Sequence, residues 1–305
     1  MTLTQLKYVI AIAEYGSISL AARQLFVTQP SMTAALRDLE QEIGKDLFVR
    51  NSRGVQLTEE GTRFLGYANQ VMQQMEMLEE RYARKDSRRY FAVSTQHYTF
   101  TASAFVELVR QYEGEDYEFF LLEERTGKII ENVKNLKSEI GILYLSQLNE
   151  AVIRKILKEN NLYFSPLFIV KPHVFLFREH PLAGKELLGL PDLEPFPCIN
   201  FDQGTDNAFY FSEEICSERF LPKHIVVTDR AAVSDLLLEL NAYIITTGIL
   251  PSYLHGQDVI ARPLDVEETI TVGVIRHADR RMSEIGHTFL KLLQKTANQV
   301  VNEKK

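Results

Sequence analysis

Four polar side chains recur along one face of a short helix predicted near the start of the chain. They are Gln29, Ser31, Thr33 and Arg37. Glutamine pairs with adenine in two places, arginine pairs with guanine, and a threonine methyl group contacts thymine. The set therefore has the chemistry needed to read base edges in the major groove of DNA. A second interpretation stays open for Arg37, which also fits a solvated helix charge beside Glu40 or Gln41.

Two more arginines, Arg50 and Arg53, follow in a segment closed by Gly54. Short apolar runs at 47–49 and 55–57 flank this segment, and the pattern predicts a hairpin with a basic tip. Such a tip would lie beside phosphates or enter the minor groove. Ordinary turn cations are the alternative reading of both arginines.

Three helices must position these groups. Apolar residues at helical spacing predict the first helix, and Gly16 is placed to end it. Ser17 and Thr28 are N-cap residues for the second and third helices. The third helix buries one stripe and ends at Gly44; the stripe consists of Met32, Leu36, Leu39 and Ile43. Together with the hairpin, these helices predict a winged helix-turn-helix over residues 1–58.

A long linker helix is predicted over residues 59–87, capped by Thr58. Its apolar residues average 3.5 residues apart, the spacing of a seam between paired helices. They are Phe64, Ala68, Val71, Met75, Leu78 and Tyr82. We expect the seam to pair two copies of the chain into a homodimer. Packing of this helix on its own domain's core is the alternative, because 3.5- and 3.6-residue periods are hard to separate over three heptads.

Charge is unevenly distributed along the 305 residues. Through Tyr90 there are 12 Lys+Arg and 11 Asp+Glu, a net charge of +1, and the remaining 22 basic and 30 acidic residues give −8, which sums to −7. A nearly neutral head on an acidic body can still bind DNA, provided that its few cations face the phosphates.

From residue 88 to 305, strand and helix patterns alternate. Strands are predicted at 91–94, 118–122, 140–145, 173–177, 225–228 and 243–246, and helices at 102–112, 127–137, 212–219, 231–241 and 283–300. Crossover helices between neighbouring strands indicate an α/β domain with a mainly parallel sheet.

The head resembles the LysR-type transcriptional regulators. The residues that carry the resemblance are the run 21–33, Leu39-Glu40, Gly44, Leu47-Phe48, Arg50 and 57–61, and His180-Pro181-Leu182-Ala183 is similar to a signature of the family's sensing domain. The resemblance implies DNA contacts at Thr28, Gln29, Pro30, Ser31, Thr33 and Arg37, with wing contacts at Arg50 and Arg53. Ala34 stands where many members have a long polar side chain, so the operator sequence is not predicted.

The resemblance also implies a periplasmic-binding-protein-like effector domain of two subdomains that the chain crosses twice. Subdomain I would span about 88–164 and 269–305, and subdomain II about 165–268. Dimers would assemble into tetramers on promoter DNA, with RNA polymerase as a candidate partner.

Polar residues follow several predicted strands of the effector domain, where backbone N–H groups at helix starts attract anions. They are Ser94, Thr95, Gln96, His97, Thr126, Asn200, Gln203, Thr205, Thr246 and Thr247. We expect them to bind a small polar or anionic metabolite. The Thr95-Gln96 pair is similar to the family's cysteine and sulfur-assimilation branch. Helix capping by Thr and Asn, and a core position for His97, are the alternatives.

Other function classes are disfavoured by the sequence. Motifs for serine hydrolases, Walker loops, zincins and dinucleotide binding are missing, so we expect no enzyme. The pairs Glu123-Glu124 and Glu213-Glu214 are interpreted as solvated runs. Cys198 and Cys216 are expected to be reduced, and no metal or cofactor is predicted besides the small-molecule effector.

The start MTLTQLKYVI lacks the features of a secretory signal, and no apolar stretch is long enough for a membrane span. These two observations predict a cytoplasmic protein without a membrane partner. Two binding proteins remain as rivals. One is a small-molecule-binding protein of transport type, and the other is an architectural DNA protein without a ligand.

Overall fold

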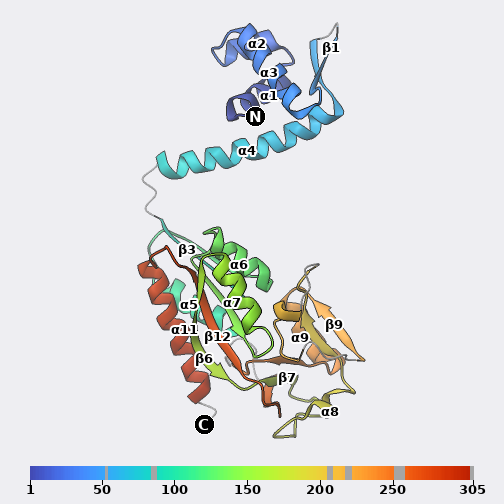
Figure 1. Ribbon diagram of the computed structural model, residues 1–305, viewed down its shortest axis with the longest axis vertical. Coiled ribbons are helices and arrows are strands. Elements are labelled where there is room, and N and C mark those ends of the chain that lie inside the picture. Colours follow the sequence, from blue (N-terminus) through green and yellow to red (C-terminus); the bar gives the residue numbers. More distant parts are fainter. Residues whose placement is uncertain (52–53, 84–87, 205–208, 217–221, 251–257, 303–305) are drawn as a thin grey trace. The chain divides into compact units, whose positions relative to one another are not determined.

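The computed structural model describes residues 1–51, 54–83, 88–204, 209–216, 222–250 and 258–302. The chain divides into two compact units, a head of residues Met1–Ser87 and an effector domain of residues Arg88–Lys305 (Figure 1). No helix among the described residues is long and apolar enough to cross a membrane.

Three helices form the core of the head. They are α1 (Leu3–Tyr15), α2 (Ile18–Gln24) and α3 (Gln29–Ile43). The predicted caps are confirmed, since the side chains of Ser17 and Thr28 accept hydrogen bonds from the first turns of α2 and α3. Gly16 and Gly44 end α1 and α3 in the left-handed conformation, at φ 61° and 66°. The predicted stripe of α3 packs into this core.

The wing is an antiparallel hairpin of β1 (Phe48–Asn51) and β2 (Gly54–Leu57). It docks on the end of α1, where the Val55 N–H donates to the Gly16 carbonyl oxygen at 3.1 Å. The next helix, α4 (Glu59–Ala83), begins beside β1, and a Cβ at Gly61 would clash with the Leu47 carbonyl oxygen. Glycine is therefore required at this junction.

The predicted seam of α4 divides into two parts. Phe64 packs on the core of the head and Ala68 is only 2% exposed, so here the helix lies on its own domain. Further along, Val71 and Leu78 are 45% and 50% exposed. Met75 is half-buried, and nothing is described of the Tyr82 side chain. The later part of the seam is the part that remains exposed for a second chain.

Subdomain I contains a five-stranded sheet in the order β4-β3-β5-β12-β6. Its strands are β3 (Arg89–Thr95), β4 (Tyr117–Glu123), β5 (Ile140–Leu145), β6 (Leu162–Val170) and β12 (Ile270–His277). Its helices are α5 (Thr99–Arg110), α6 (Thr126–Lys134), α7 (Glu150–Glu159) and α11 (Glu284–Asn302). Helices α5 and α11 lie side by side against the sheet (Figure 1).

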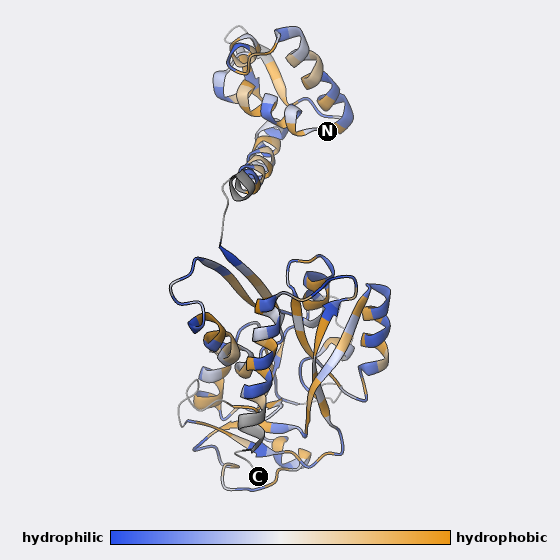
Figure 2. Ribbon diagram, turned by 90° about the vertical axis from the view of Figure 1, so that its left-hand side faces the viewer, coloured by the Kyte–Doolittle hydropathy of each residue, from blue (hydrophilic) through white to orange (hydrophobic). Residues whose placement is uncertain are grey.

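Subdomain II contains two smaller sheets, of order β10-β7-β11 and β8-β9, which a bridge between Cys198 and Tyr243 joins. Its strands are β7 (His173–Phe177), β8 (Cys198–Phe201), β9 (His224–Val227), β10 (Ile244–Thr246) and β11 (Val259–Pro263). It also holds α8 (Leu190–Leu193), α9 (Arg230–Leu240) and the short η1 (Phe209–Phe211). Figure 2 shows hydrophobic residues along the strands and hydrophilic residues on the outer helix faces.

Three expectations about the effector domain need correction. The sheets are mixed rather than mainly parallel, because β12 runs antiparallel to both β5 and β6. Strand β6 stays in the first sheet as far as Val170, so the chain enters subdomain II about six residues later than expected. The helix expected at 212–219 is wrong over 212–216, where the chain follows η1 with bends and turns. There the buried carboxylates of Glu213 and Glu214 bond to neighbouring segments, which fixes an irregular path.

Candidate DNA-binding surface and effector cleft

Helix α3 presents its predicted polar residues on one side. Gln29, Pro30, Thr33, Ala34, Arg37, Asp38 and Gln41 line a shallow hollow along it. Arg37 is exposed and has no ion-pair partner among the described residues. Glu40, its proposed partner in the alternative reading, instead accepts from the backbone N–H groups of Leu47 and Phe48 at 2.8 and 3.2 Å. The arginine is therefore available to contact another molecule.

The first turn of α3 is arranged by its own hydroxyl groups. Thr28 and Ser31 share a hydrogen bond of 2.8 Å between their side chains, and both remain accessible at the surface. The Ser19 hydroxyl donates to the side-chain carbonyl oxygen of Gln29 at 2.8 Å, which directs the amide nitrogen of Gln29 elsewhere. An exposed amide donor thus stands at the start of α3.

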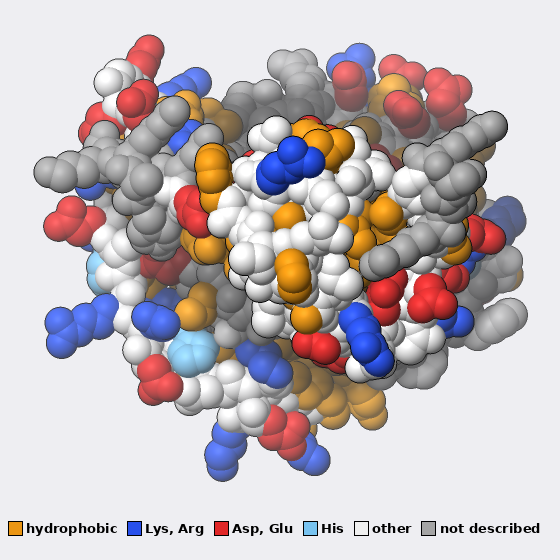
Figure 3. Space-filling view, turned by 90° about the horizontal axis from the view of Figure 1, so that it is seen from above, with side chains coloured by type: hydrophobic (Ala, Val, Ile, Leu, Met, Phe, Trp, Pro, Cys, Tyr) orange, Lys and Arg blue, Asp and Glu red, His pale blue; other side chains and the backbone are white. Residues whose placement is uncertain are grey.

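The two wing arginines are only partly described. Arg50 lies on β1 in register with Val55, and nothing is described of its side chain. Arg53 lies outside the described residues. On the surface seen in Figure 3, Lys and Arg side chains are interspersed with Asp and Glu. On that face cationic contacts with DNA would be local rather than spread over a broad basic surface.

The effector domain has a charged hollow between its subdomains, at the carboxyl ends of β3 and β4. It has a volume of about 400 Å³ and is lined by His97, Glu123, Glu124, Arg125, Lys128, Asp202 and Thr228. This is the place where ligands bind to open α/β sheets.

Ion pairs and hydrogen bonds cross this hollow from one subdomain to the other. Arg230 at the start of α9 pairs with Glu123 at the end of β4, with nitrogen–oxygen distances of 2.7 and 2.9 Å. Arg125 pairs with Asp202. The Glu213 carboxylate accepts from the backbone N–H of His97 and bonds its ring nitrogen Nδ1, both at 2.9 Å. These contacts hold the two subdomains together.

The structure does not bring all the predicted effector residues to this hollow. Ser94 and Thr95 are fully buried, Ser94 bonding Ser138 and Asn132 and Thr95 bonding Thr101. Gln96 is 1% exposed, and its amide bonds Thr126, Tyr98 and Tyr144. These three side chains are satisfied inside the protein and do not line the hollow.

The remaining predicted residues are placed in different ways. The Thr126 N–H at the start of α6, a candidate anion donor, donates to the Gln203 side-chain oxygen at 3.1 Å. Asn200 donates to Glu214 at 3.1 Å, and the Thr247 hydroxyl accepts from the backbone of Ile249. Thr205 lies outside the described residues. Of the set, His97 and Thr246 line cavities.

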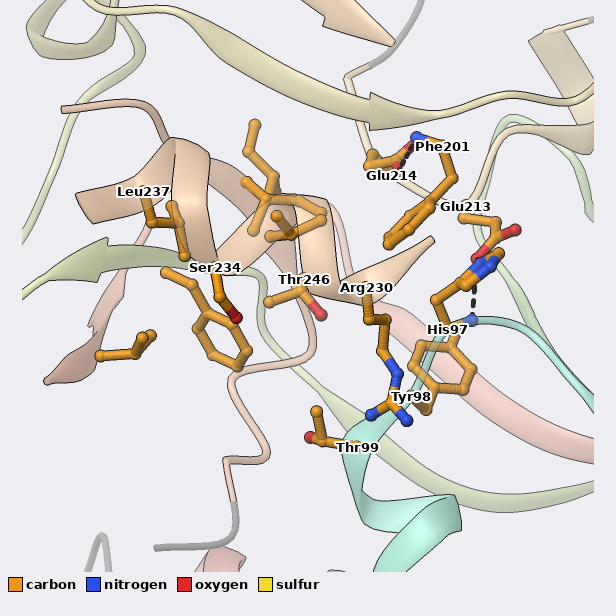
Figure 4. A pocket seen from close by; sticks show the side chains of 15 residues that line it. His97, Tyr98, Thr99, Phe201, Glu213, Glu214, Arg230, Ser234, Leu237 and Thr246 are labelled. Atoms are coloured by element: carbon orange, nitrogen blue, oxygen red, sulfur yellow. Dashed lines mark hydrogen bonds and ion pairs between the residues drawn. The ribbon is translucent and has the colours of Figure 1, made fainter. Parts of the chain in front are cut away.

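A second cavity, the apolar pocket, opens beside His97 (Figure 4). Its volume is about 50 Å³. Its walls are mostly hydrophobic, with polar groups at the edge; they comprise His97, Tyr98, Thr99, Phe175, Phe201, Glu213, Glu214, Arg230, Val233, Ser234, Leu237, Ile244, Ile245, Thr246 and Val259. The ring of His97 stacks on Phe201 at 3.8 Å between centroids.

The interpretation of Glu213 and Glu214 as a solvated run is wrong, since they are 9% and 3% exposed. Burial, together with the charge of Glu213, raises the pKa of Glu214 to about 7. Burial by itself would lower the pKa of His97, but the hydrogen bond and charge of Glu213 outweigh it and raise that pKa. The sequence did not show this, because adjacent acids normally lie on surfaces.

Two other singled-out groups are structural. Burial raises the pKa of the Cys198 thiol to about 12, so it holds its proton at neutral pH and is a poor nucleophile. His180 is 2% exposed and bonds the Asn241 carbonyl oxygen at 2.9 Å through Nε2. Within the part of the chain that is described, no group of three or more His, Cys, Asp or Glu could hold a metal ion.

Both units match known protein families. Residues 3–62 match the bacterial regulatory helix-turn-helix protein model of the lysR family, and residues 91–298 match the LysR substrate binding domain. A regulator of Escherichia coli K12, the uncharacterized HTH-type transcriptional regulator YbhD, is 25% identical over 302 residues, covering 95% of this chain and 90% of that one. The regulator ClcR of Pseudomonas putida is 47% identical over 72 residues, 24% of either chain.

Solved structures give the same fold. Full-length CbnR complexed with its target DNA has a TM-score of 0.52 at 18% identity, covering 97% of this chain and all of that one. A hydrogen-peroxide-bound cysteine mutant of Corynebacterium glutamicum OxyR has a TM-score of 0.50 at 20% identity, covering 99% and 96%. The chain thus belongs to the LysR family of bacterial transcription regulators, with a DNA-binding head and an effector-binding domain, and is not an enzyme.

Proposed function

We propose that α3 binds promoter DNA and that a small molecule held between subdomains I and II changes this binding. The observation that carries the proposal is the charged hollow, because the groups that join its walls make polar contacts that a ligand can replace. A ligand shifts such an arrangement only if it binds one state more tightly than the other.

On the DNA side, Gln29, Thr33 and Arg37 would face base edges, with Thr28, Pro30 and Ser31 at the phosphates beside the first turn of α3. Arg50 and Arg53 would contact the backbone from the wing. The exposed amide of Gln29 and the exposed guanidinium of Arg37 support this assignment.

Assembly is the second part of the proposal. The exposed side chains of Val71 and Leu78 would pair with a second copy, giving a homodimer and, on promoter DNA, a homotetramer in contact with RNA polymerase in the cytoplasm. Sedimentation of the full chain across a concentration series would measure the assembly. A monomer at all concentrations would contradict this part alone.

The coupling can be tested before an effector is known. Genomic DNA fragments selected by the full-length protein would be footprinted with wild type, with Arg230→Ala, which breaks the Glu123 pair, and with Arg154→Ala, which breaks only the surface pair with Glu150. We expect an altered footprint or bend for Arg230→Ala alone. Identical footprints for all three proteins would refute coupling between the hollow and the head.

A link to sulfur metabolites remains a narrower hypothesis. It rests on Thr95 and Gln96, whose side chains bond within the protein, so the hypothesis has no support beyond the sequence similarity. Titration of the full-length protein with O-acetylserine, cysteine, sulfate and thiosulfate, followed by calorimetry, decides it. Saturable binding of one of these would revive the hypothesis.

A further inference from the structure

The charged hollow and the apolar pocket form two parts of one site. His97 lines both cavities, and the Arg230–Glu123 pair stands at their boundary, since Arg230 lines the pocket and Glu123 lines the hollow. In Figure 4 the Arg230 guanidinium points toward Thr99 and Tyr98 beside His97. A ligand that fills both cavities must have a polar end and an apolar end.

Backbone donors for an anion are already occupied. The His97 N–H donates to the Glu213 carboxylate, and the Thr126 N–H donates to Gln203. Three carboxylates reach the hollow, those of Glu123, Glu124 and Asp202, against the cations of Arg125, Lys128 and Arg230. The charges balance, so a ligand with a net charge would leave one group unpaired, which is costly in a partly buried site.

Two carboxylates in the hollow have capacity for a further donor. Arg230 Nη2 lies 2.7 Å from the buried Oε1 of Glu123, but this oxygen has no aligned hydrogen-bond donor among the described residues. Glu124 likewise has no ion-pair partner in the described parts of the chain, because Lys128 pairs with Glu131 at 2.9 Å. These oxygens call for a cationic donor such as an ammonium group.

We propose that the site takes a zwitterionic α-amino acid with a short aliphatic side chain, an assignment that rests on the ligand-controlled function proposed above. The ammonium group binds Glu123 and Glu124, the carboxylate binds the guanidinium of Arg230, and the hollow stays neutral. The side chain enters the pocket between Phe201, Val233 and Leu237. A pocket of about 50 Å³ holds roughly three to five non-hydrogen atoms, the size of a valine, leucine or methionine side chain.

Calorimetric titration of the full-length protein tests the assignment with analogues that lack one charge. The probes are valine, leucine, isoleucine and methionine, with 4-methylpentanoate as the acid without the amine and 3-methylbutylamine as the amine without the acid. We expect at least one of the four amino acids to bind ten-fold more tightly than either analogue. Phenylalanine, whose side chain exceeds the pocket, is expected to bind more weakly.

Variants locate the site. Glu123→Gln should weaken binding of the amino acid at least ten-fold, while Glu150→Gln, in an exposed pair on α7, should leave it unchanged. Thermal melting of both variants checks that they fold, and the analogue series needs no variant. Failure of all four amino acids to bind, or equal binding of 4-methylpentanoate, overturns the assignment. Either result leaves the footprinting experiment above intact, so the proposed function would stand or fall separately.

Discussion

In the head, the polar residues of α3 lie at the surface, and Arg37 has no ion-pair partner among the described residues. In the effector domain, the comparable residues after β3 are buried, and Gln96 alone bonds three groups of its own chain. The difference follows from the size of the partner. A DNA groove approaches from outside and needs projecting side chains, whereas a small molecule is enclosed by a cavity whose polar groups must be satisfied when it is empty.

The largest expected effect comes from Gln96→Ala. Three buried partners would lose their hydrogen bonds, so we expect the free energy of unfolding of the effector domain to fall by about 3–5 kcal/mol. Urea denaturation followed by circular dichroism measures it, with the exposed Gln294→Ala on α11 as the matched control. A loss below about 1 kcal/mol would contradict the comparison and assign Gln96 to ligand binding after all.

Arg37→Ala tests the head in the same way. Stability should change by no more than about 0.5 kcal/mol, because the side chain is exposed. Affinity for a selected operator should fall by about 10- to 100-fold, with a smaller loss on random DNA. Fluorescence anisotropy compares it with Lys7→Ala, an exposed cation on α1. Equal losses on both DNAs would assign Arg37 to phosphate contact only.

The smallest expected effect concerns pH. Because the pKa of Glu214 is raised from 4.5 to about 7, the folded state holds this proton more tightly than the unfolded state. Stability of the effector domain should therefore fall as pH rises from about 4.5 to 7, and Glu214→Gln should reduce that fall by about 1–2 kcal/mol. Urea denaturation at pH 5 and pH 7 compares the two proteins.

His97 adds a loss of the same sign that Glu214→Gln leaves in place. Its raised pKa makes a contribution that is complete below about 6.5 and disappears as pH rises through the folded value. A variant His97→Gln provides the separate control. Equal pH dependence of wild type and Glu214→Gln would mean that Glu214 is charged in the folded protein at pH 5.

Local sequence rules were enough to predict the head. Ser17, Thr28, Gly16 and Gly44 mark helix ends, and the stripe of α3 leaves its polar face outward. Cap geometry and helical period depend on residues three or four positions apart, so no distant information is needed. The family resemblance rests on this part of the chain as well.

The effector site, in contrast, required the folded chain. Arg230 and Glu123 meet across 107 residues, and Glu213 reaches His97 across 116. Adjacent acids predict a solvated surface unless the fold brings a histidine and backbone donors to them. Helix α4 showed a similar limit, because one seam serves both its own core and an exposed face. Which polar group is exposed and which is buried depends on pairing between distant segments, and no local pattern encodes that pairing.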